Sequence, residues 1–318
     1  MAASGSSDVE PWRVELDEQI ADEKSWGNEQ NTEAAEILLE MFLSYPQTGH
    51  LASLKAALRI AADYWAKFLP SSQDPLNKPY MMEDKGMSDY LSRFYELIFY
   101  QSWLLRHDDP RQDLLVRLLA DLRNLPKVTY KSESRQKEYH AFYNDPVFLM
   151  MSDEYWNAKF SNVLSASHYS PSADFDPESD RPEPKNPQEK KDFHITCDEW
   201  INFSAFQARY CGSGAFGPGG GSLKFPSIDI PLAFEKDLPA GRLGECRILV
   251  ASNWIIHAGK IIRDSMEKKS TDGWDLQTWK RWSERITEIL KSAKHSEEVT
   301  SALEKAFNET DTIGLGGE

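Results

Sequence analysis

Residues 196–210, TCDEWINFSAFQARY, combine aromatic side chains with polar groups that could bind a ligand. At helical spacing, Trp200 falls on one stripe, while Asn202, Phe206 and Arg209 fall on a second. Two aromatic stripes indicate contacts on more than one side of the helix. Asn202 and Arg209 would then be enclosed, and each would need a hydrogen-bond partner. They either tie this helix to its neighbours or contribute to a ligand pocket, and the sequence favours neither role.

Three further ionisable residues are candidates for chemistry. Asp229 and Glu235 lie in a short, proline-bounded acidic stretch, for which a solvated face is the simplest interpretation. Glu235 is nevertheless the best candidate to pair with Arg209, because a carboxylate can satisfy the guanidinium group with two hydrogen bonds. His257 follows Trp254 on a long apolar helix, where a hydrogen-bonded core histidine is commoner than a catalytic one.

Several established site types are not expected. The chain has seven histidines but neither His-Glu-x-x-His nor Cys-x-x-Cys, so we expect no metal site and no cofactor. The glycine-rich residues 212–222 lack the preceding strand and the Gly-Lys-Ser/Thr of a phosphate-binding loop, so we interpret them as a flexible connector.

Composition sets the class of protein. The chain has 318 residues, of which 40% are hydrophobic, so it can build a large core. Its formal charge of −15 disfavours non-specific binding to nucleic acid or anionic membranes. No apolar run is long enough to span a membrane, and three scattered cysteines are typical of a reducing compartment. We therefore expect a cytoplasmic protein.

The elements that position these residues are all helical. Eight to ten helices and no convincing alternating strand predict an all-α fold with a single multi-helix domain. We expect a mobile N-terminal arm over residues 1–30 and the helical domain over residues 31–295. A disordered, acidic and proline-rich insertion is expected at residues 171–193, as an inert loop or a lid, and a helix end with a frayed tail at residues 296–318.

Some element boundaries can be predicted. Thr196 and Glu199 form a capping-box pattern that would start the central helix, and Gly212 would end it. Pro46 should end an earlier helix, and Asp109 should cap a helix that starts at Pro110.

Two other helices follow from apolar spacing. One covers residues 51–68, and its core face is expected to consist of Leu51, Leu54, Leu58, Ala61, Trp65 and Phe68. A short helix covers residues 232–238.

Residues 90–290 resemble a fungal family of unknown function. The matching features are a helix like residues 114–126, the Trp-x-Asn-x-x-x-Phe-x-Ala-Arg run, a Trp-Ile-x-His segment and a closing Trp-x-x-Trp helix. In this chain the run is Trp200, Asn202, Phe206, Ala208 and Arg209. The resemblance implies a helical domain and no particular reaction.

In size and character the chain is also similar to fungal arginine-containing cyclodipeptide synthases of secondary metabolism, which are transferases that use aminoacyl-tRNAs. That similarity implies an amino-acid substrate, an aminoacyl-tRNA partner and a carboxylate that receives the arginine guanidinium. The implied catalytic candidates are Glu199, Glu235 and His257. The implied substrate site comprises Trp200, Asn202, Phe206, Arg209, Asp229 and Trp254.

The alternative function is a non-enzymatic helical module that binds a protein partner or a small ligand. The electrostatic surface distinguishes the enzyme from the binding module. A basic patch beside an aromatic-lined pocket would favour the tRNA-dependent enzyme, with Lys159, Arg263, Lys280 and Arg281 as its candidate members. An acidic surface with a groove would favour the module.

Overall fold

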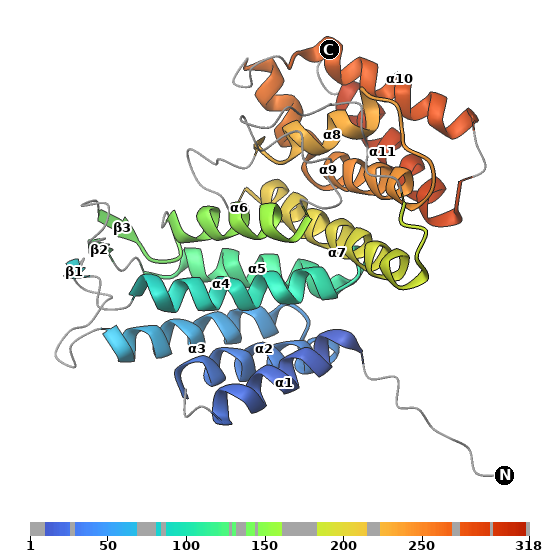
Figure 1. The fold of residues 1–318 in the computed structure, drawn as a ribbon. Helices are drawn as coiled ribbons and strands as arrows, with labels where there is room; N and C mark the ends of the chain where they lie inside the picture. The colour runs from blue at the N-terminus through green and yellow to red at the C-terminus, as the bar shows by residue number, and fades with distance from the viewer. Residues whose placement is uncertain are drawn as a thin grey trace, which may run out of the picture. The chain divides into compact units, whose positions relative to one another are not determined.

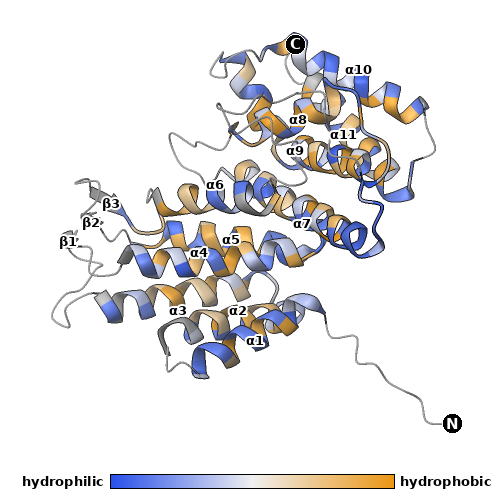
Figure 2. Ribbon diagram, viewed as in Figure 1, coloured by the Kyte–Doolittle hydropathy of each residue, from blue (hydrophilic) through white to orange (hydrophobic). Residues whose placement is uncertain are grey.

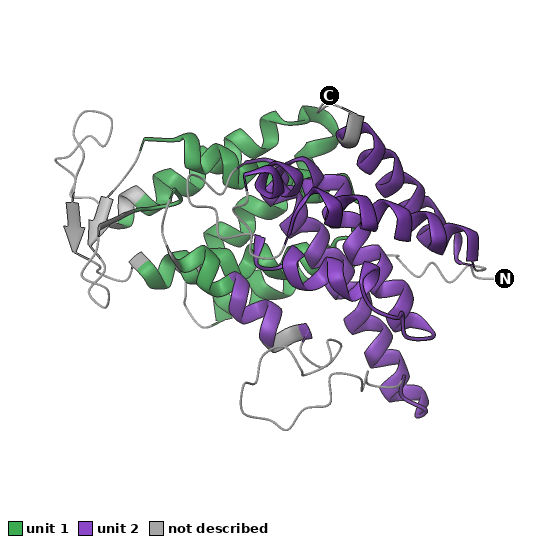
Figure 3. Cartoon of the chain, turned by 90° about the horizontal axis from the view of Figure 1, so that it is seen from above, with its two compact units in different colours: residues 1–151 green, residues 152–318 purple. Residues whose placement is uncertain are grey.

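The structure is a computed structural model that describes residues 10–25, 29–68, 81–83, 87–126, 129–131, 138–143, 146–160, 183–214, 223–268, 274–292 and 295–315. Within these residues the chain forms eleven α-helices and three short strands (Figure 1). The predicted all-α class is confirmed. The helical chain divides into two compact units, Met1–Met151 (unit 1) and Ser152–Glu318 (unit 2), shown in Figure 3. Hydrophobic and hydrophilic residues alternate around the helices (Figure 2), as expected where each helix buries one side.

Unit 1 is built from five helices and the start of a sixth. They are α1 (Pro11–Ser25), α2 (Glu29–Thr48), α3 (Leu51–Phe68), α4 (Met87–Leu104), α5 (Pro110–Asn124) and α6 (Pro146–Phe160). The strands β1 (Met81–Glu83), β2 (Thr129–Lys131) and β3 (Glu138–His140) form a small sheet in the order β1-β2-β3. β1 pairs with β2 in parallel, and β2 pairs with β3 antiparallel. The sequence did not predict these strands, because three residues are too few to show an alternating pattern.

α1 occupies residues that were expected to be a mobile arm. Pro11 stands at its first position, and Trp12 and Leu16, one turn apart, are both buried. The ring of Trp12 packs edge-on against Phe42 of α2, with their centroids 5.1 Å apart. Two buried side chains on one face therefore hold this acidic helix on the unit.

α2 and α3 correct two predictions. α2 continues through Pro46 to Thr48, and the Gly49 amide donates to the Tyr45 carbonyl at 2.8 Å to close the last turn. α3 has its predicted bounds, but the first part of its predicted core face is wrong: Leu51, Leu54 and Leu58 are exposed, whereas Ala61 is buried. The side chains of Trp65 and Phe68 lie outside the described residues. The core face of α3 is instead lined by smaller side chains and one tyrosine, Ala52, Ala56, Ala57, Ile60, Ala61 and Tyr64. Small side chains let neighbouring helices approach closely, and this packing outweighs the leucine pattern.

α5 begins as predicted. The Asp109 side chain accepts a hydrogen bond from the Arg111 amide at 2.8 Å, and Pro110 takes the first helical position.

Unit 2 contains the end of α6 and five further helices. They are α7 (Pro187–Gly212), α8 (Pro226–Phe234), α9 (Arg242–Glu267), α10 (Leu276–Ser292) and α11 (Glu297–Leu315). α9 is the central element and packs against α7, α8, α10 and α11. Its predicted core face is buried, with Ile248, Ala251, Ile255, Ala258 and Ile262 each at most 2% exposed.

α7 begins nine residues before the predicted cap. Asn186 is the N-cap, because its side chain accepts hydrogen bonds from the amides of Gln188 and Glu189, and Pro187 follows at the first position. Thr196 is inside the helix, where its hydroxyl donates to the Asp192 carbonyl at 2.9 Å. The last residues of the expected insertion, from 187 to 193, are thus the first turns of α7, and residues 171–182 lie outside the described residues. The predicted end at Gly212 is confirmed.

Two boundaries in the C-terminal half also differ. The short helix α8 covers Pro226–Phe234 rather than residues 232–238, because Pro226 can start a helix. α11 is a full helix in place of most of the expected frayed tail. It buries Val299, Leu303 and Ala306 against its neighbours, since these apolar residues recur at helical spacing.

Candidate functional site

The residues singled out on α7 lie in the core of unit 2. Trp200 and Phe206 are fully buried, and Asn202 is 9% exposed. Glu199 and Arg209 are half-buried, and Arg209 Nη1 donates to the Ala205 carbonyl at 3.3 Å. The two aromatic stripes therefore do pack on more than one side, and α7 positions these side chains among other helices rather than along an open cavity wall.

Two contacts define how α7 pairs with α9. Cys246 Sγ donates to the Cys197 carbonyl at 3.4 Å. Farther along both helices, a Cβ atom on Gly212 would lie 1.8 Å from the His257 carbonyl oxygen, so only glycine fits there. Because the second contact lies nearer the C-terminal end of both helices than the first, α7 and α9 run in the same direction. The half-buried His257 thus lies where the two backbones approach most closely.

Asp229 and Trp254 are brought together as a buried pair. Trp254 Nε1 donates to Asp229 Oδ2 at 2.8 Å, from α9 to α8. Asp229 is 1% exposed, and Asp229 Oδ1 has no hydrogen-bond partner among the described residues. Burial raises the pKa of Asp229 to about 7, although the hydrogen bond from Trp254 opposes the rise. Asp229 is therefore buried in the core of unit 2 and not part of a solvated face.

Glu235 makes a different contact from the one expected. It lies just after α8, is exposed, and accepts a hydrogen bond from Trp282 Nε1 at 2.8 Å. The proposed pairing of Glu235 with Arg209 is replaced by this link between α8 and α10. Among the nine candidates of unit 2, the structure joins Asp229 and Trp254 directly by a hydrogen bond.

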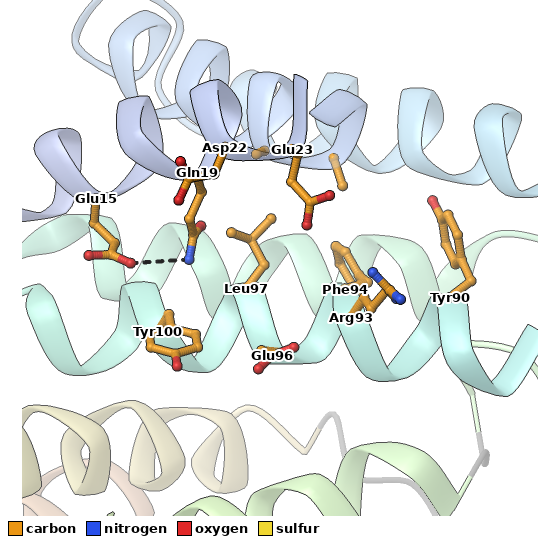
Figure 4. A pocket seen from close by; sticks show the side chains of 12 residues that line it. Glu15, Gln19, Asp22, Glu23, Tyr90, Arg93, Phe94, Glu96, Leu97 and Tyr100 are labelled. Atoms are coloured by element: carbon orange, nitrogen blue, oxygen red, sulfur yellow. Dashed lines mark hydrogen bonds between the residues drawn. The ribbon is translucent and has the colours of Figure 1, made fainter. Parts of the chain in front are cut away.

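A groove in unit 1 has the geometry of a binding site. It lies between α1 and α4, with α2 behind, and encloses about 510 Å³ (Figure 4). The lining residues from α1 are Glu15, Gln19, Asp22 and Glu23. Those from α2 and α4 are Ala34, Ala35, Tyr90, Arg93, Phe94, Glu96, Leu97 and Tyr100. Four carboxylates against one arginine give the groove an acidic lining.

The floor of the groove is apolar and its rim is polar. Phe94 and Leu97 are 2% and 8% exposed and form the floor with two alanines of α2. Figure 4 shows the carboxylates of Glu15 and Glu23 pointing from α1 toward α4, and Gln19 Nε2 donates to Glu15 Oε1 at 3.3 Å. An apolar floor with carboxylates above it suits a cation on an aliphatic stem.

Two tyrosines stand at the sides of the groove. Burial, and then the charges of Glu96 and Glu15, raise the pKa of Tyr100. Burial also raises the pKa of Tyr90, whose hydroxyl donates to Asp63 Oδ2 at 3.1 Å. Both phenols are therefore neutral hydroxyls at physiological pH. Lys67 Nζ already lies 5.1 Å from the centre of the Tyr90 ring, so the half-buried Tyr100 is the ring that offers a face to a further cation.

The α1 wall is anchored at its first turn. Arg111 of α5 binds Glu10 Oε1 at 2.5 Å and Asp109 Oδ2 at 2.6 Å. Its guanidinium carbon also lies 4.7 Å from the centre of the Trp12 ring. The hydrogen bonds from Arg111 lower the pKa of Glu10 to about 2, so this anchor stays charged at neutral pH.

The groove could not be predicted once residues 1–30 were expected to form a mobile arm. A usable signal was present: Pro11 can start a helix, and Trp12 and Leu16 are spaced for one buried face. Placing the acidic residues of α1 on the opposite side of that helix would have shown a charged wall.

Two other site types are absent from the described residues. In that part of the chain no group of three histidine, cysteine or carboxylate side chains is placed to hold a metal ion. No helix there is long and apolar enough to cross a membrane.

The fold defines an all-α protein, and comparison with protein families identifies the family of the chain. The family described as "Protein of unknown function (DUF3632)" matches residues 95–294, and the chain belongs to that family. The expected resemblance to a helical family of unknown function is thereby confirmed. Comparisons with curated proteins and with solved structures find no match. The match begins within α4 and ends after α10, so α1, α2 and α3 lie outside it.

Proposed function

We propose that the protein is a non-enzymatic helical binding module whose groove between α1 and α4 takes a basic segment of a partner protein. The observation that carries this proposal is the groove itself, a space of about 510 Å³ with acidic side chains on both walls. Glu15, Asp22 and Glu23 come from α1, and Glu96 comes from α4.

The chemistry of the groove favours an arginine or lysine side chain. A guanidinium group can form two parallel hydrogen bonds with one carboxylate, and such charge-assisted bonds are stronger than neutral ones. The aliphatic stem would lie on Phe94 and Leu97, and the ring of Tyr100 could contact the cation. Aminoacyl-tRNA is disfavoured at the same surface, because its phosphates would meet these carboxylates.

The charge of the whole chain also supports a basic partner. A formal charge of −15 would attract a basic partner and speed its association. We place this interaction in the cytoplasm, which agrees with the reduced state of the three buried cysteines.

The experiment is a calorimetric titration of the full chain with a short capped peptide of alternating arginine and glycine. A peptide with citrulline in place of arginine keeps the shape without the charge. We expect the arginine peptide to bind and the citrulline peptide to bind at least ~10-fold more weakly. The double variant Glu15→Gln, Glu96→Gln should bind the arginine peptide more weakly than the unmodified chain by a similar factor.

A matched variant tests whether position matters. Glu284 and Glu288 lie on α10 in unit 2, and Glu284→Gln, Glu288→Gln makes the same change in net charge. This variant should bind the arginine peptide within ~2-fold of the unmodified chain, since neither residue lines the groove. Equal weakening in the two double variants would mean that only the net charge attracts the peptide, and the groove proposal would fail.

A second candidate function is the fungal tRNA-dependent cyclodipeptide synthase of secondary metabolism. One observation favours it: Asp229 is a buried carboxyl with a pKa near 7, and perturbed pKa values cluster at catalytic sites. Against it, Arg263 is paired with Glu267 at 2.7 Å, and Lys280 lies 3.8 Å from Glu284. Arg281 donates to the Thr278 hydroxyl at 2.8 Å, and the side chain of Lys159 lies outside the described residues. Expression in a heterologous host with untargeted metabolite analysis tests this function, because it requires a new arginine diketopiperazine.

A further inference from the structure

Four leucines gather on the exposed surface of α2 and α3. Leu51 is 65% exposed, Leu58 50%, Leu43 45% and Leu54 42%. They are four of the nine large apolar side chains that are exposed among the described residues, and the other five are divided among α1, α6, α7 and α10. Single exposed leucines are ordinary, but a cluster on one surface marks an interaction site.

The leucines of α3 have the spacing of a helix-packing stripe. Leu51, Leu54 and Leu58 are three and four residues apart, so they lie on one side of the helix. The helix is already packed through its alanine side, and this leucine side is therefore a second apolar face.

A groove runs beside this stripe between α2 and α3. It encloses about 420 Å³. Its lining includes Ile37 and Met41 of α2 and Ala52 and Ala56 of α3, all at most 3% exposed. Two alanines one turn apart leave a recess into which a large side chain from another helix could fit.

The charges around the groove indicate the chemistry of its occupant. Glu36 is paired with Lys24 at 2.7 Å, and Glu40 is paired with Arg59. Lys55, on the same exposed side of α3 as Arg59, forms no ion pair among the residues that the structure describes. The acidic residues beside the groove are thus neutralised, while a positive charge remains next to the leucines.

We propose that the leucine face, defined by Leu43, Leu51, Leu54 and Leu58, is a docking surface for an amphipathic helix of another protein with acidic flanks. Leucine-type anchors of that helix fill the recess over Ala52 and Ala56, and a carboxylate beside them meets Lys55. A second copy of this chain fits less well, because the leucine face of that copy would bring its own Lys55 toward this one instead of a carboxylate.

This inference goes beyond the acidic groove of α1 and α4. The two surfaces involve different residues and select opposite charges, so the module could hold a basic segment and an acidic helix at the same time. It would then act as an adaptor between two partners.

The test uses a fluorescein-labelled synthetic helix of 20 residues, a length chosen as about that of α2. It carries leucines at coiled-coil core positions and glutamates beside them. A second peptide has lysine in place of each glutamate. Fluorescence anisotropy with the full chain should show the glutamate helix binding at least ~10-fold more tightly than the lysine helix. Equal affinity for the two helices would remove the charge argument and overturn the proposal.

Two sets of variants locate the binding surface. The variant Leu51→Ser, Leu58→Ser should weaken binding of the glutamate helix by ~10-fold or more, and Lys55→Glu should reverse the preference between the two helices. Ile195 and Leu276 are each 44% exposed in unit 2, so Ile195→Ser, Leu276→Ser is the matched control and should bind normally.

Circular dichroism must show unchanged helix content, which is expected because all of these side chains are exposed. Unaltered binding by the Leu51→Ser, Leu58→Ser variant would overturn the proposal. So would sedimentation showing that the unmodified chain is a dimer that this variant converts to a monomer, since the face would then be occupied by a second copy.

Discussion

Trp254 Nε1 donates a hydrogen bond to Asp229 Oδ2 at 2.8 Å, and both side chains are buried in unit 2. One hydrogen bond does not compensate a carboxylate for the loss of water, so the pKa of Asp229 rises to about 7. This residue should therefore influence how the stability of the protein depends on pH.

The first prediction concerns Asp229→Asn. The folded protein keeps the Asp229 proton up to about pH 7, whereas the unfolded chain releases it near the ordinary value of 3.8. The folded state thus binds more protons between these values, and the free energy of unfolding of the natural chain falls as pH rises through this window. Asparagine cannot ionise, so Asp229→Asn should remove that decline. A pKa difference of one corresponds to about 1.4 kcal/mol. The stability of Asp229→Asn relative to the natural chain should therefore be greater at pH 8 than at pH 4, by on the order of a few kcal/mol.

Urea unfolding from pH 4 to 8 measures this effect. Trp254→Phe is the companion variant: it removes a hydrogen bond that lowers the pKa of Asp229, so it should extend the decline to higher pH. Parallel stability curves for the natural chain and Asp229→Asn would contradict the assignment.

The second prediction concerns the contact between α7 and α9. A Cβ atom at residue 212 would lie 1.8 Å from the His257 carbonyl oxygen, far inside van der Waals contact. Gly212→Ala must push the two helices apart, and we expect a loss of about 1–3 kcal/mol in the free energy of unfolding. The neighbouring Ser213 is exposed, so Ser213→Ala should cost much less. If both variants show the same denaturation midpoint in urea, the close approach of the two helices is wrong.

The third prediction concerns the anchor of α1. Arg111 contacts Glu10, Asp109 and the ring of Trp12, so Arg111→Ala should loosen the first turn of α1 at a cost of about 1–2 kcal/mol. Hydrogen exchange should then accelerate at the amides of α1 and remain unchanged at those of α7 and α9. The control is Arg13→Ala on the exposed side of α1, where the ion pair with Asp17 is 3.8 Å long and exposed. Unchanged exchange in α1 of the Arg111→Ala variant would show that this residue does not hold the wall of the groove.

Much of the helical framework follows from local rules. Capping and proline placement predicted the start of α5 at Asp109 and Pro110, and apolar spacing predicted α9 and its buried face. These features depend on residues within one or two turns of each other, so the sequence contains the whole signal.

Local rules could not predict the orientation of α3 or the groove between α1 and α4. Both sides of α3 are apolar, and the choice of Ala52 and Ala56 for the core depends on how closely α2 and α5 approach. The groove depends on α1 reaching α4, which are about seventy residues apart in the chain. Likewise, the partner of Glu235 is Trp282 on another helix, and no local pattern specifies that contact.

The position of a bound basic segment tests the central claim most directly. Methyl groups of the alanine and leucine residues can be labelled and followed by nuclear magnetic resonance while the arginine peptide is added. Ala34, Ala35 and Leu97 line the groove, and their signals should shift and saturate together. Leu303 and Ala306 of α11 are buried in unit 2, and their signals should stay in place. Saturating shifts at Leu303 and Ala306, with none at Ala34, Ala35 and Leu97, would contradict the account.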